Sequence, residues 1–248
     1  MTIDIESLEL ATLDAVAPTA IDTMPGWLLP FDTTTVGRAI SAVPVRHQDV
    51  DPGLVPEIIA RYAERGLSTQ FRIAEVPGTS ALRQALLHLG YLPHQPTLTM
   101  IGSTSHWPTN PRQPVQLSEQ ATPAWQAVYL SGDFDPLDGS NRVRALSRSK
   151  CLVYAWIEDA SGGIAAGTAA FSRGWVSLHG LRTVARERGK GCARDLIAAL
   201  GEEASARHVD RCFLQVEARN EPAIRLYRTL GFQAAWLYHY WREVKGCA

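Results

Sequence analysis

The stretch RGKGCA, Arg188–Ala193, constrains the fold most, because two glycines and two cations stand directly before an amphipathic run at residues 192–208. The preceding run, WVSLHGLRTV at residues 175–184, is rich in apolar and β-branched residues and predicts a strand. Glycine permits positive φ, and the unpaired N–H groups of a first helical turn favour an anion. The segment therefore predicts a strand, a tight turn and a helix. Two interpretations stay open, a phosphate cradle or a basic, solvated turn.

The spacing of the glycines excludes two common phosphate loops. A P-loop of the form G-x-x-x-x-G-K-[ST] would need glycine where Val184 stands and a hydroxyl residue where Gly191 stands. A dinucleotide fingerprint G-x-G-x-x-G that begins at Gly189 would need a third glycine where Arg194 stands. What remains is a glycine turn with two flanking cations, followed by a helix that begins with small residues.

The composition changes near the middle of the chain, where a stretch rich in Pro, Ser and Thr predicts a linker at about residues 103–114. The linker divides the chain into a smaller N-terminal α/β domain, residues 1–105, and a second domain, residues 112–248. Strands and helices are expected on both sides. The strands expected in the first domain include residues 36–45 and residues 97–102.

The ends of the two domains form a weak internal repeat. Residues 58–100 and 197–240 share the order helix, strand, helix, Leu-Gly-aromatic, strand, and LGY at 89–91 matches LGF at 230–232. This shared order predicts a duplicated fold. The first copy has VRHQDVDPG where the second has the glycine turn. We therefore expect that only the second copy kept that turn.

The composition also limits the class of protein. With 24 Lys and Arg against 25 Asp and Glu, the formal net charge is −1, so no broad basic field indicates nucleic acid as a partner. Cys151, Cys192, Cys212 and Cys247 lack metal-ligand spacing, which predicts reduced thiols and no metal site. The sequence has no signal peptide pattern and no apolar run near the roughly 20 residues that span a bilayer. We expect a cytoplasmic protein that binds neither nucleic acid nor membrane.

A second motif, LQVEARNEPAIRLYRTLGF at residues 214–232, follows at the next strand and helix. Together with the glycine turn, it resembles the GNAT superfamily of N-acetyltransferases over about residues 115–245. The pyrophosphate loop of that family, Gln/Arg-x-x-Gly-x-Gly/Ala, is matched by Arg188, Gly191 and Ala193. Its downstream signature is matched by Leu214, Val216, Asn220, Ala223, Leu226, Tyr227, Gly231 and Phe232.

The resemblance implies an α/β (mixed α+β) GNAT fold, in which helices flank a central mixed sheet with two splayed strands. The smaller N-terminal domain resembles a degenerate copy of that fold, and we transfer no functional residue to it. The family implies acetyl-CoA as acyl donor, with pantetheine in the gap between the splayed strands and the diphosphate at the glycine turn. The residues implied to bind it are Leu181, Thr183, Val184, Arg188, Gly189, Lys190, Gly191, Cys192, Ala193, Asn220, Ala223 and Tyr227.

Three side chains are candidates for catalysis. The resemblance implies that Tyr227 protonates the departing thiolate, although its helical spacing also fits a core residue with a polar tip. An amine with a pKa of about 10 must lose a proton before it attacks. Glu217 and His179 are the candidate bases, each of which also fits a structural role. A chain of ordered water could replace both.

Other polar residues near these motifs have simpler interpretations. Asn220 is expected to cap the following helix, whether or not it also contacts pantetheine. Cys192 is expected to face the diphosphate, not the acyl group, which argues against a covalent acyl-enzyme. Tyr238, His239 and Tyr240 in the last strand fit either packing or the lining of an acceptor pocket.

The sequence thus predicts an N-acetyltransferase that transfers an acetyl group from acetyl-CoA to a primary amine by direct attack in a ternary complex. The alternative is a non-catalytic acyl-CoA-binding or sensor protein, which would have no need of a thiolate acid such as Tyr227. The expected acceptor is a small-molecule amine or a peptide. The chain is expected to be a monomer or a homodimer.

Overall fold

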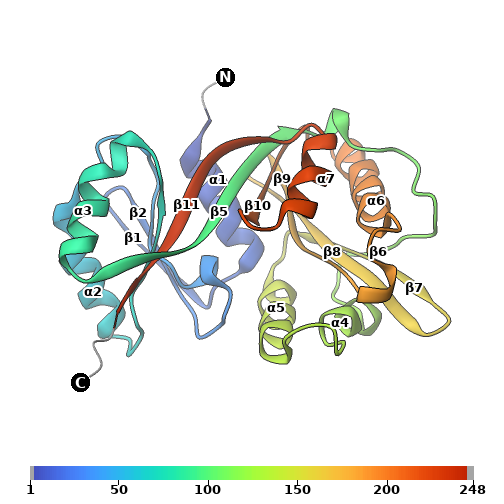
Figure 1. Ribbon diagram of the computed structural model, residues 1–248, viewed down its shortest axis with the longest axis horizontal. Coiled ribbons are helices and arrows are strands. Elements are labelled where there is room, and N and C mark those ends of the chain that lie inside the picture. Colours follow the sequence, from blue (N-terminus) through green and yellow to red (C-terminus); the bar gives the residue numbers. More distant parts are fainter. Residues whose placement is uncertain (1–2, 245–248) are drawn as a thin grey trace.

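One sheet of eight strands runs through both halves of the chain in the computed structural model, which describes residues 3–244 (Figure 1). In spatial order its strands are β4 (Gln70–Ala74), β11 (Gln233–Glu243), β5 (Tyr91–Ser103), β10 (Arg211–Glu217), β9 (Trp175–Thr183), β8 (Gly162–Ser172), β7 (Leu152–Asp159) and β6 (Gln116–Ser118). All neighbours are antiparallel except β9 and β10, which are parallel. The expected mixed sheet is therefore confirmed.

Helices cover both faces of the C-terminal part of this sheet. The helices α6 (Cys192–Ala206) and α7 (Glu221–Thr229) pack on one face, and α1 (Ile5–Val16), α4 (Pro123–Tyr129) and α5 (Pro136–Arg148) on the other. Alternating residues of β7 serve the two layers. Val153 and Ile157 belong to the core beneath α6, whereas Leu152 and Tyr154 belong to the core beneath α4 and α5.

The N-terminal lobe has a smaller sheet of its own. The strands β1 (Ala20–Met24), β2 (Trp27–Phe31) and β3 (Val43–Pro44) form it, and a single parallel bridge from Ala42 to Phe71 links it to β4. The helices α2 (Val55–Ala63) and α3 (Ser80–His88) complete this lobe, at the left of Figure 1. A buried apolar cluster that includes Ile58, Phe71 and Leu86 holds its elements together.

The two lobes exchange their last strands. The N-terminal half runs β4, α3, β5 and the C-terminal half runs β10, α7, β11, yet β5 pairs with β10 and β11 pairs with β4. The two long strands β5 and β11 pair with each other in the middle (Figure 1). The arrangement is symmetric about that central pair, which fits the duplication expected from the repeat. Because of this exchange, strands from both halves pair in one continuous sheet.

Several parts of the first half differ from the expectations. The strand expected at residues 36–45 is only β3, because Gly37–Ala39 form a 3₁₀ turn. Gly37 packs so closely on the ring of Tyr240 that a Cβ atom there would lie 2.7 Å from ring carbons. Strand β5 begins six residues earlier than expected, since its first part, with Pro93 and Pro96, pairs only with β11. Helix α1 was not expected; the side chain of Asp4 caps it.

The linker is irregular after a 3₁₀ turn at Thr104–His106, and it is packed against the second half. Trp107 is buried, with its ring centroid 5.9 Å from that of Phe232. The division of the chain into domains 1–105 and 112–248 stays a prediction. Cys151, Cys192 and Cys212 are free thiols, and Cys247 lies outside the described residues. Within residues 3–244, no helix has the length and apolar character needed to cross a bilayer.

Candidate active site

A cleft opens where β9 and β10 separate. Their ladder runs only from Val176–Leu178 on β9 against Cys212–Leu214 on β10, although both strands continue beyond it. The cleft between the diverging ends has a volume of about 200 Å³. The splayed pair that the resemblance implied is therefore present.

A β-bulge turns β9 toward the cleft. The register of β8 against β9 shifts between Ala166 and Thr168, so that Gly180 and Leu181 together face one residue of β8. Gly180 has a φ of +62°, and its carbonyl accepts a 2.7 Å hydrogen bond from the hydroxyl of Tyr129. The bulge thus depends on a glycine and is fixed by a side chain from α4.

The cleft brings together predicted and unpredicted residues. Those expected from the sequence are His179, Leu181, Glu217, Asn220 and Tyr227. Those that sequence reasoning missed as site residues include Arg38, Arg142, Arg182 and Gln215. Arg38 comes from the N-terminal lobe and stands in a stretch expected to be a strand, so no sequence signal pointed to it. Gln215 was recognisable only as the neighbour of Glu217 on the polar side of β10.

Tyr227 lies on α7 with its ring centroid 5.9 Å from that of Phe232, at an interplanar angle of 68°. Burial raises the pKa of its phenol to about 12. The hydroxyl therefore stays protonated at neutral pH and is a hydrogen-bond donor. Among the described residues it has no hydrogen-bond partner within the fold, so its proton is available to a group that enters the cleft.

Asn220 is the N-cap of α7, as expected. Its Oδ1 accepts a 3.3 Å hydrogen bond from the backbone N–H of Ala223, and Pro222 occupies the first turn. The cap uses only the carbonyl oxygen of the amide. The side-chain N–H₂ group remains a donor at the edge of the cleft.

His179 is buried and neutral. Its Nε2 lies 2.8 Å from the hydroxyl oxygen of Ser177, while Nδ1 has no partner among the described residues. Burial lowers the pKa of His179 well below its ordinary value, and the charges of Arg38 and Arg142 lower it further. A ring with so low a pKa is a weak base.

Glu217 is half-buried at the mouth of the same cleft. Its Oε1 accepts a 3.0 Å hydrogen bond from Gln95 Nε2, and its Oε2 lies 2.7 Å from Nε of Arg219. Leu214 and Val216 are buried while Gln215 and Glu217 are half-buried, so the expected alternation along β10 is confirmed. The carboxylate is held at the cleft but is already paired with a cation.

The glycine turn leaves the beginning of α6 open. Gly189 and Gly191 have φ values of +77° and +92°, and Gly191 is the N-cap, so no side chain caps the helix. The first helical hydrogen bond runs from the N–H of Asp195 to the carbonyl of Gly191, 3.1 Å. The N–H groups of residues 192–194 precede it. Arg188 and Lys190 are exposed beside them. These features fit a diphosphate group at the turn.

A linker residue that the sequence did not single out also reaches this turn. Arg112 donates from Nη2 to the carbonyl of Lys190, 3.3 Å, and from Nε to Oδ1 of the buried Asp195, 3.1 Å. Burial alone would raise the pKa of Asp195, but hydrogen bonds from Arg112 and Gln113 outweigh it and hold that pKa below its ordinary value. The linker is thereby fixed over α6, with a cation beside the open helix end.

The remaining residues expected at the cofactor have mixed surroundings. The carbonyl of Thr183 accepts a 3.1 Å hydrogen bond from Nε of Arg188. The N–H of Val184 donates to the carbonyl of Ile164, 2.9 Å, so this donor is used within the fold. Cys192 is buried at the first position of α6, and Ala193 and Ala223 are half-buried. Their contacts with a cofactor stay predictions.

The aromatic residues of the last strand serve packing. Tyr238 and Tyr240 are buried with Leu8 and Trp175 in the core beneath α1. His239 lies 3.6 Å from Glu75, at the other side of β11. None of the three lines the cleft.

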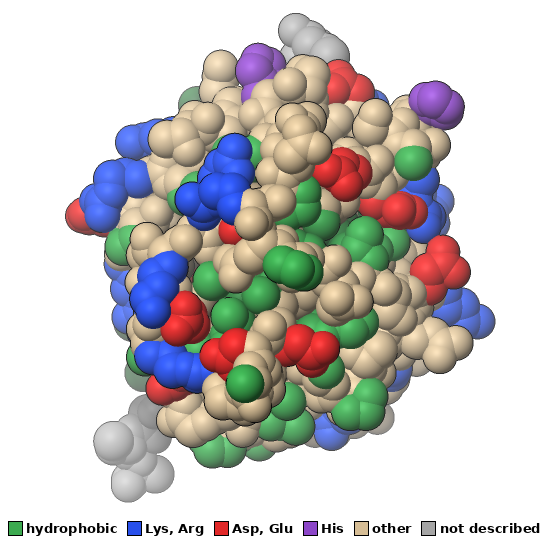
Figure 2. Space-filling model, turned by 90° about the vertical axis from the view of Figure 1, so that its right-hand side faces the viewer, with side chains coloured by type: hydrophobic (Ala, Val, Ile, Leu, Met, Phe, Trp, Pro, Cys, Tyr) green, Lys and Arg blue, Asp and Glu red, His purple; other side chains and the backbone are tan. Residues whose placement is uncertain are grey.

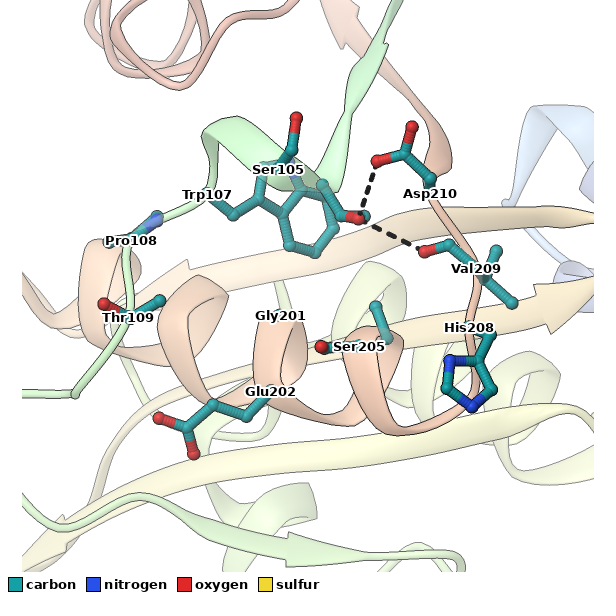
Figure 3. A pocket seen from close by; sticks show the side chains of 12 residues that line it. Ser105, Trp107, Pro108, Thr109, Gly201, Glu202, Ser205, His208, Val209 and Asp210 are labelled. Atoms are coloured by element: carbon teal, nitrogen blue, oxygen red, sulfur yellow. Dashed lines mark hydrogen bonds between the residues drawn. The ribbon is translucent and has the colours of Figure 1, made fainter.

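A larger cavity, about 600 Å³, lies away from the predicted site. Figure 3 shows it between the start of the linker, at Ser105 and Trp107, and the C-terminal half of α6, at Glu202 and Ser205. The Thr104 hydroxyl beside it donates to the carbonyl of Val209. Figure 2 shows the face that includes α6, where Lys and Arg gather toward one edge with Asp and Glu among them. Charges of both signs thus share this face.

The sequence matches one family model over residues 2–241, described as "Probable histone acetyltransferase Rv0428c C-terminal". A stretch of 90 residues is 31% identical to the N-acetyltransferase YobR of Bacillus subtilis, and it covers 36% of each chain. The match thus spans about a third of that relative.

Two solved structures resemble the fold. A GCN5-related N-acetyltransferase from Kribbella flavida has a TM-score of 0.70 at 17% identity, with 98% of this chain and 96% of that chain covered. A tandem GNAT protein from the clavulanic acid biosynthesis pathway has a TM-score of 0.60 at 14% identity, with 95% and 94% covered. The splayed cleft, the open glycine turn and the family match agree. This chain belongs to that acetyltransferase family and, with it, to the GNAT superfamily.

Proposed function

We propose that the protein transfers an acetyl group from acetyl-CoA to a primary amine by direct attack in a ternary complex. The observation that carries this proposal is the position of Tyr227, a protonated donor without an internal partner, in the cleft between β9 and β10. The open end of α6, with Arg188 and Lys190 beside it, supports a diphosphate at the outer end of the same site. The residues therefore fit an acyl-CoA.

Bound acetyl-CoA supplies an activated acetyl group and, after transfer, a thiolate leaving group. The amine nitrogen forms the new bond to the acetyl carbon as the carbon–sulfur bond breaks. The Tyr227 hydroxyl is the donor for the sulfur. Its pKa of about 12 makes it a weak acid, so its hydrogen bond stabilises the thiolate before a proton is delivered. Backbone N–H groups near Leu181 and Thr183 are the candidates to stabilise the carbonyl oxygen.

The proton of the amine needs an acceptor. Glu217 lies at the mouth of the cleft and faces solvent in part, whereas His179 is buried and holds a proton poorly. Glu217 is therefore the better candidate for the base, and Arg219 lies beside its carboxylate. Water at the open mouth can connect Glu217 to the amine.

A thiol-release assay with acetyl-CoA and a panel of primary amines tests this function. We expect Tyr227→Phe to lower kcat by a factor of about 10² to 10⁴, the usual range for a general acid, with little change in acetyl-CoA affinity. Tyr62→Phe is the matched control. It removes a buried hydroxyl that bonds the carbonyl of Pro30 in the other lobe, and it should cost stability without lowering kcat. Saturable acetyl-CoA binding without turnover on any amine would instead support a non-catalytic acyl-CoA-binding or sensor protein.

A further inference from the structure

Three guanidinium groups from three separate elements line the cleft. Arg38 follows β2, Arg142 lies on α5, and Arg182 lies on β9. One carboxylate, Asp138, serves two of them: it accepts from Nε of Arg142 at 2.8 Å and also pairs with Arg182. Since Glu217 is already paired with Arg219, the cleft carries an excess of positive charge.

Arg38 is the least compensated of these cations. Its Nη1 donates a 3.0 Å hydrogen bond to Oε1 of Gln215, a neutral group, and within residues 3–244 it forms no ion pair. Burial lowers the pKa of Arg38, and repulsion from Arg142 and Arg72 acts in the same direction, yet a guanidinium stays charged in proteins. Arg38 is half-buried at the cleft, so its charge is partly desolvated there and would favour an anionic ligand.

Two donors behind the wall of the cleft lack acceptors. Nε2 of Gln215 and Nη1 of Arg182 are inaccessible to solvent and have no hydrogen-bond partner in the described part of the chain. Both nitrogens can only donate. Both nitrogens are closed off from the open space, so the half-buried guanidinium of Arg38 is the donor that a ligand in the cleft can reach.

We propose that the acyl acceptor carries a carboxylate near its amine, and that Arg38 and Arg142 bind this carboxylate. The inference rests on the proposed function and specifies its substrate class. A guanidinium fork matches the two oxygens of a carboxylate, and a cleft of about 200 Å³ admits a small molecule. Because Tyr227 lines the same cleft, a carboxylate held there places the amine of a small amino acid near the acetyl group.

The test is the thiol-release assay with α-, β- and γ-amino acids, each beside its carboxamide. For the best acceptor we expect kcat/KM at least about 30-fold above that of its amide, the effect of one desolvated charge pair. Arg38→Met should raise KM for the acid by roughly 30-fold and leave the amide unaffected, so that the preference disappears. Arg38→Lys should restore part of the preference. Arg225→Met, which removes an exposed arginine on the outer side of α7, should change neither value.

The possible outcomes separate this inference from the proposed function. Equal turnover of acids and amides by the unaltered protein would overturn the inference and leave the acetyltransferase function intact. Turnover of aminoalkylphosphonates in preference to carboxylates would overturn the choice of anion. Binding of acetyl-CoA without turnover of any acceptor would overturn the function and the inference together. If a thermal melt shows that Arg38→Met is unfolded, the test uses Arg142→Met instead. In that variant Asp138 still pairs with Arg182, and we expect the same loss of preference for the acid over the amide.

Discussion

The two halves of the molecule differ most where a loop leads into a helix. In the N-terminal half, Oδ1 of Asp51 accepts a 2.8 Å hydrogen bond from the N–H of Gly53, so a carboxylate occupies the beginning of the turn that leads into α2. In the C-terminal half, Gly191 leaves the beginning of α6 without a side-chain cap, and cations surround it. The turn before α2 is capped by a side chain of the fold itself, whereas the start of α6 has no side-chain cap.

The next helices differ in the same sense. When LGY at 89–91 is placed on LGF at 230–232, Leu86 corresponds to Tyr227 and Thr79 to Asn220. Leu86 and Thr79 are fully buried, whereas Tyr227 and Asn220 line the cleft. The two halves share the order of these elements, but only the second copy of the repeat has polar groups on this helix facing the cleft. The N-terminal half instead supplies Arg38 to the cleft in the C-terminal half.

The largest effect is expected on acetyl-CoA affinity, from a substitution that blocks the uncapped beginning of α6. In Gly191→Val, a Cβ atom at a φ of +92° would lie 1.6 Å from Nη2 of Arg112, and backbone strain adds about 1–3 kcal/mol. We expect the dissociation constant of acetyl-CoA, measured by calorimetry, to rise roughly 100-fold. Gly174→Val is the control, because Gly174 has a φ of +74° with no atom within 4 Å of its Cβ position. Equal affinity in both variants would return RGKGCA to the status of a basic turn.

A smaller effect is expected on the free energy of unfolding, from removal of the side-chain cap before α2. Asp51→Ala removes the cap and should lower the free energy of unfolding by about 1 kcal/mol, measured by urea denaturation. Acetyl-CoA should still bind with one molecule per chain and unchanged affinity, because the N-terminal loop lacks the glycine turn. A second molecule of acetyl-CoA bound per chain would mean that only the Asp51 side chain keeps acetyl-CoA from binding before α2. The two halves would then not differ in their ability to bind it.

The smallest effect concerns the histidine in the N-terminal loop. Burial, with repulsion from Arg72, lowers the pKa of His47 to about 4, and its ring packs edge-on against Trp236 at 4.7 Å. The unfolded chain therefore binds the proton first, so stability is lost as pH falls from about 6.5 to about 4.

Between pH 7 and pH 6 the loss from His47 should stay below about 1 kcal/mol. We expect His47→Gln to flatten the pH dependence of the unfolding free energy in this window. The residual slope should come from His179 and His239, whose pKa values burial also lowers. If this pH dependence is the same in His47→Gln as in the unaltered protein, burial of a neutral His47 ring does not contribute to it.

Much of the fold could be predicted because its elements follow from local patterns. The alternation in β7, the cap at Asn220 and the positive φ of Gly189 and Gly191 all depend on near neighbours in the chain. The 3₁₀ turn at Gly37 could not be predicted, because the ring of Tyr240 that it packs against lies about two hundred residues away. Helix α1 was missed although its own residues favour a helix, since Asp4 caps it and Leu, Glu and Ala are good helix formers.

The sequence by itself determined the class of protein, since its two motifs depend on residue types at fixed spacing along one loop and one helix. The diphosphate at the glycine turn stays a prediction. Only the tertiary structure decided the composition of the cleft. Arg38 and Arg142 are separated by about a hundred residues, and Gln215 follows after about seventy more, yet all three line one cavity. The electrostatic field that selects an acceptor is a sum over neighbours in space. No spacing along the chain encodes that sum.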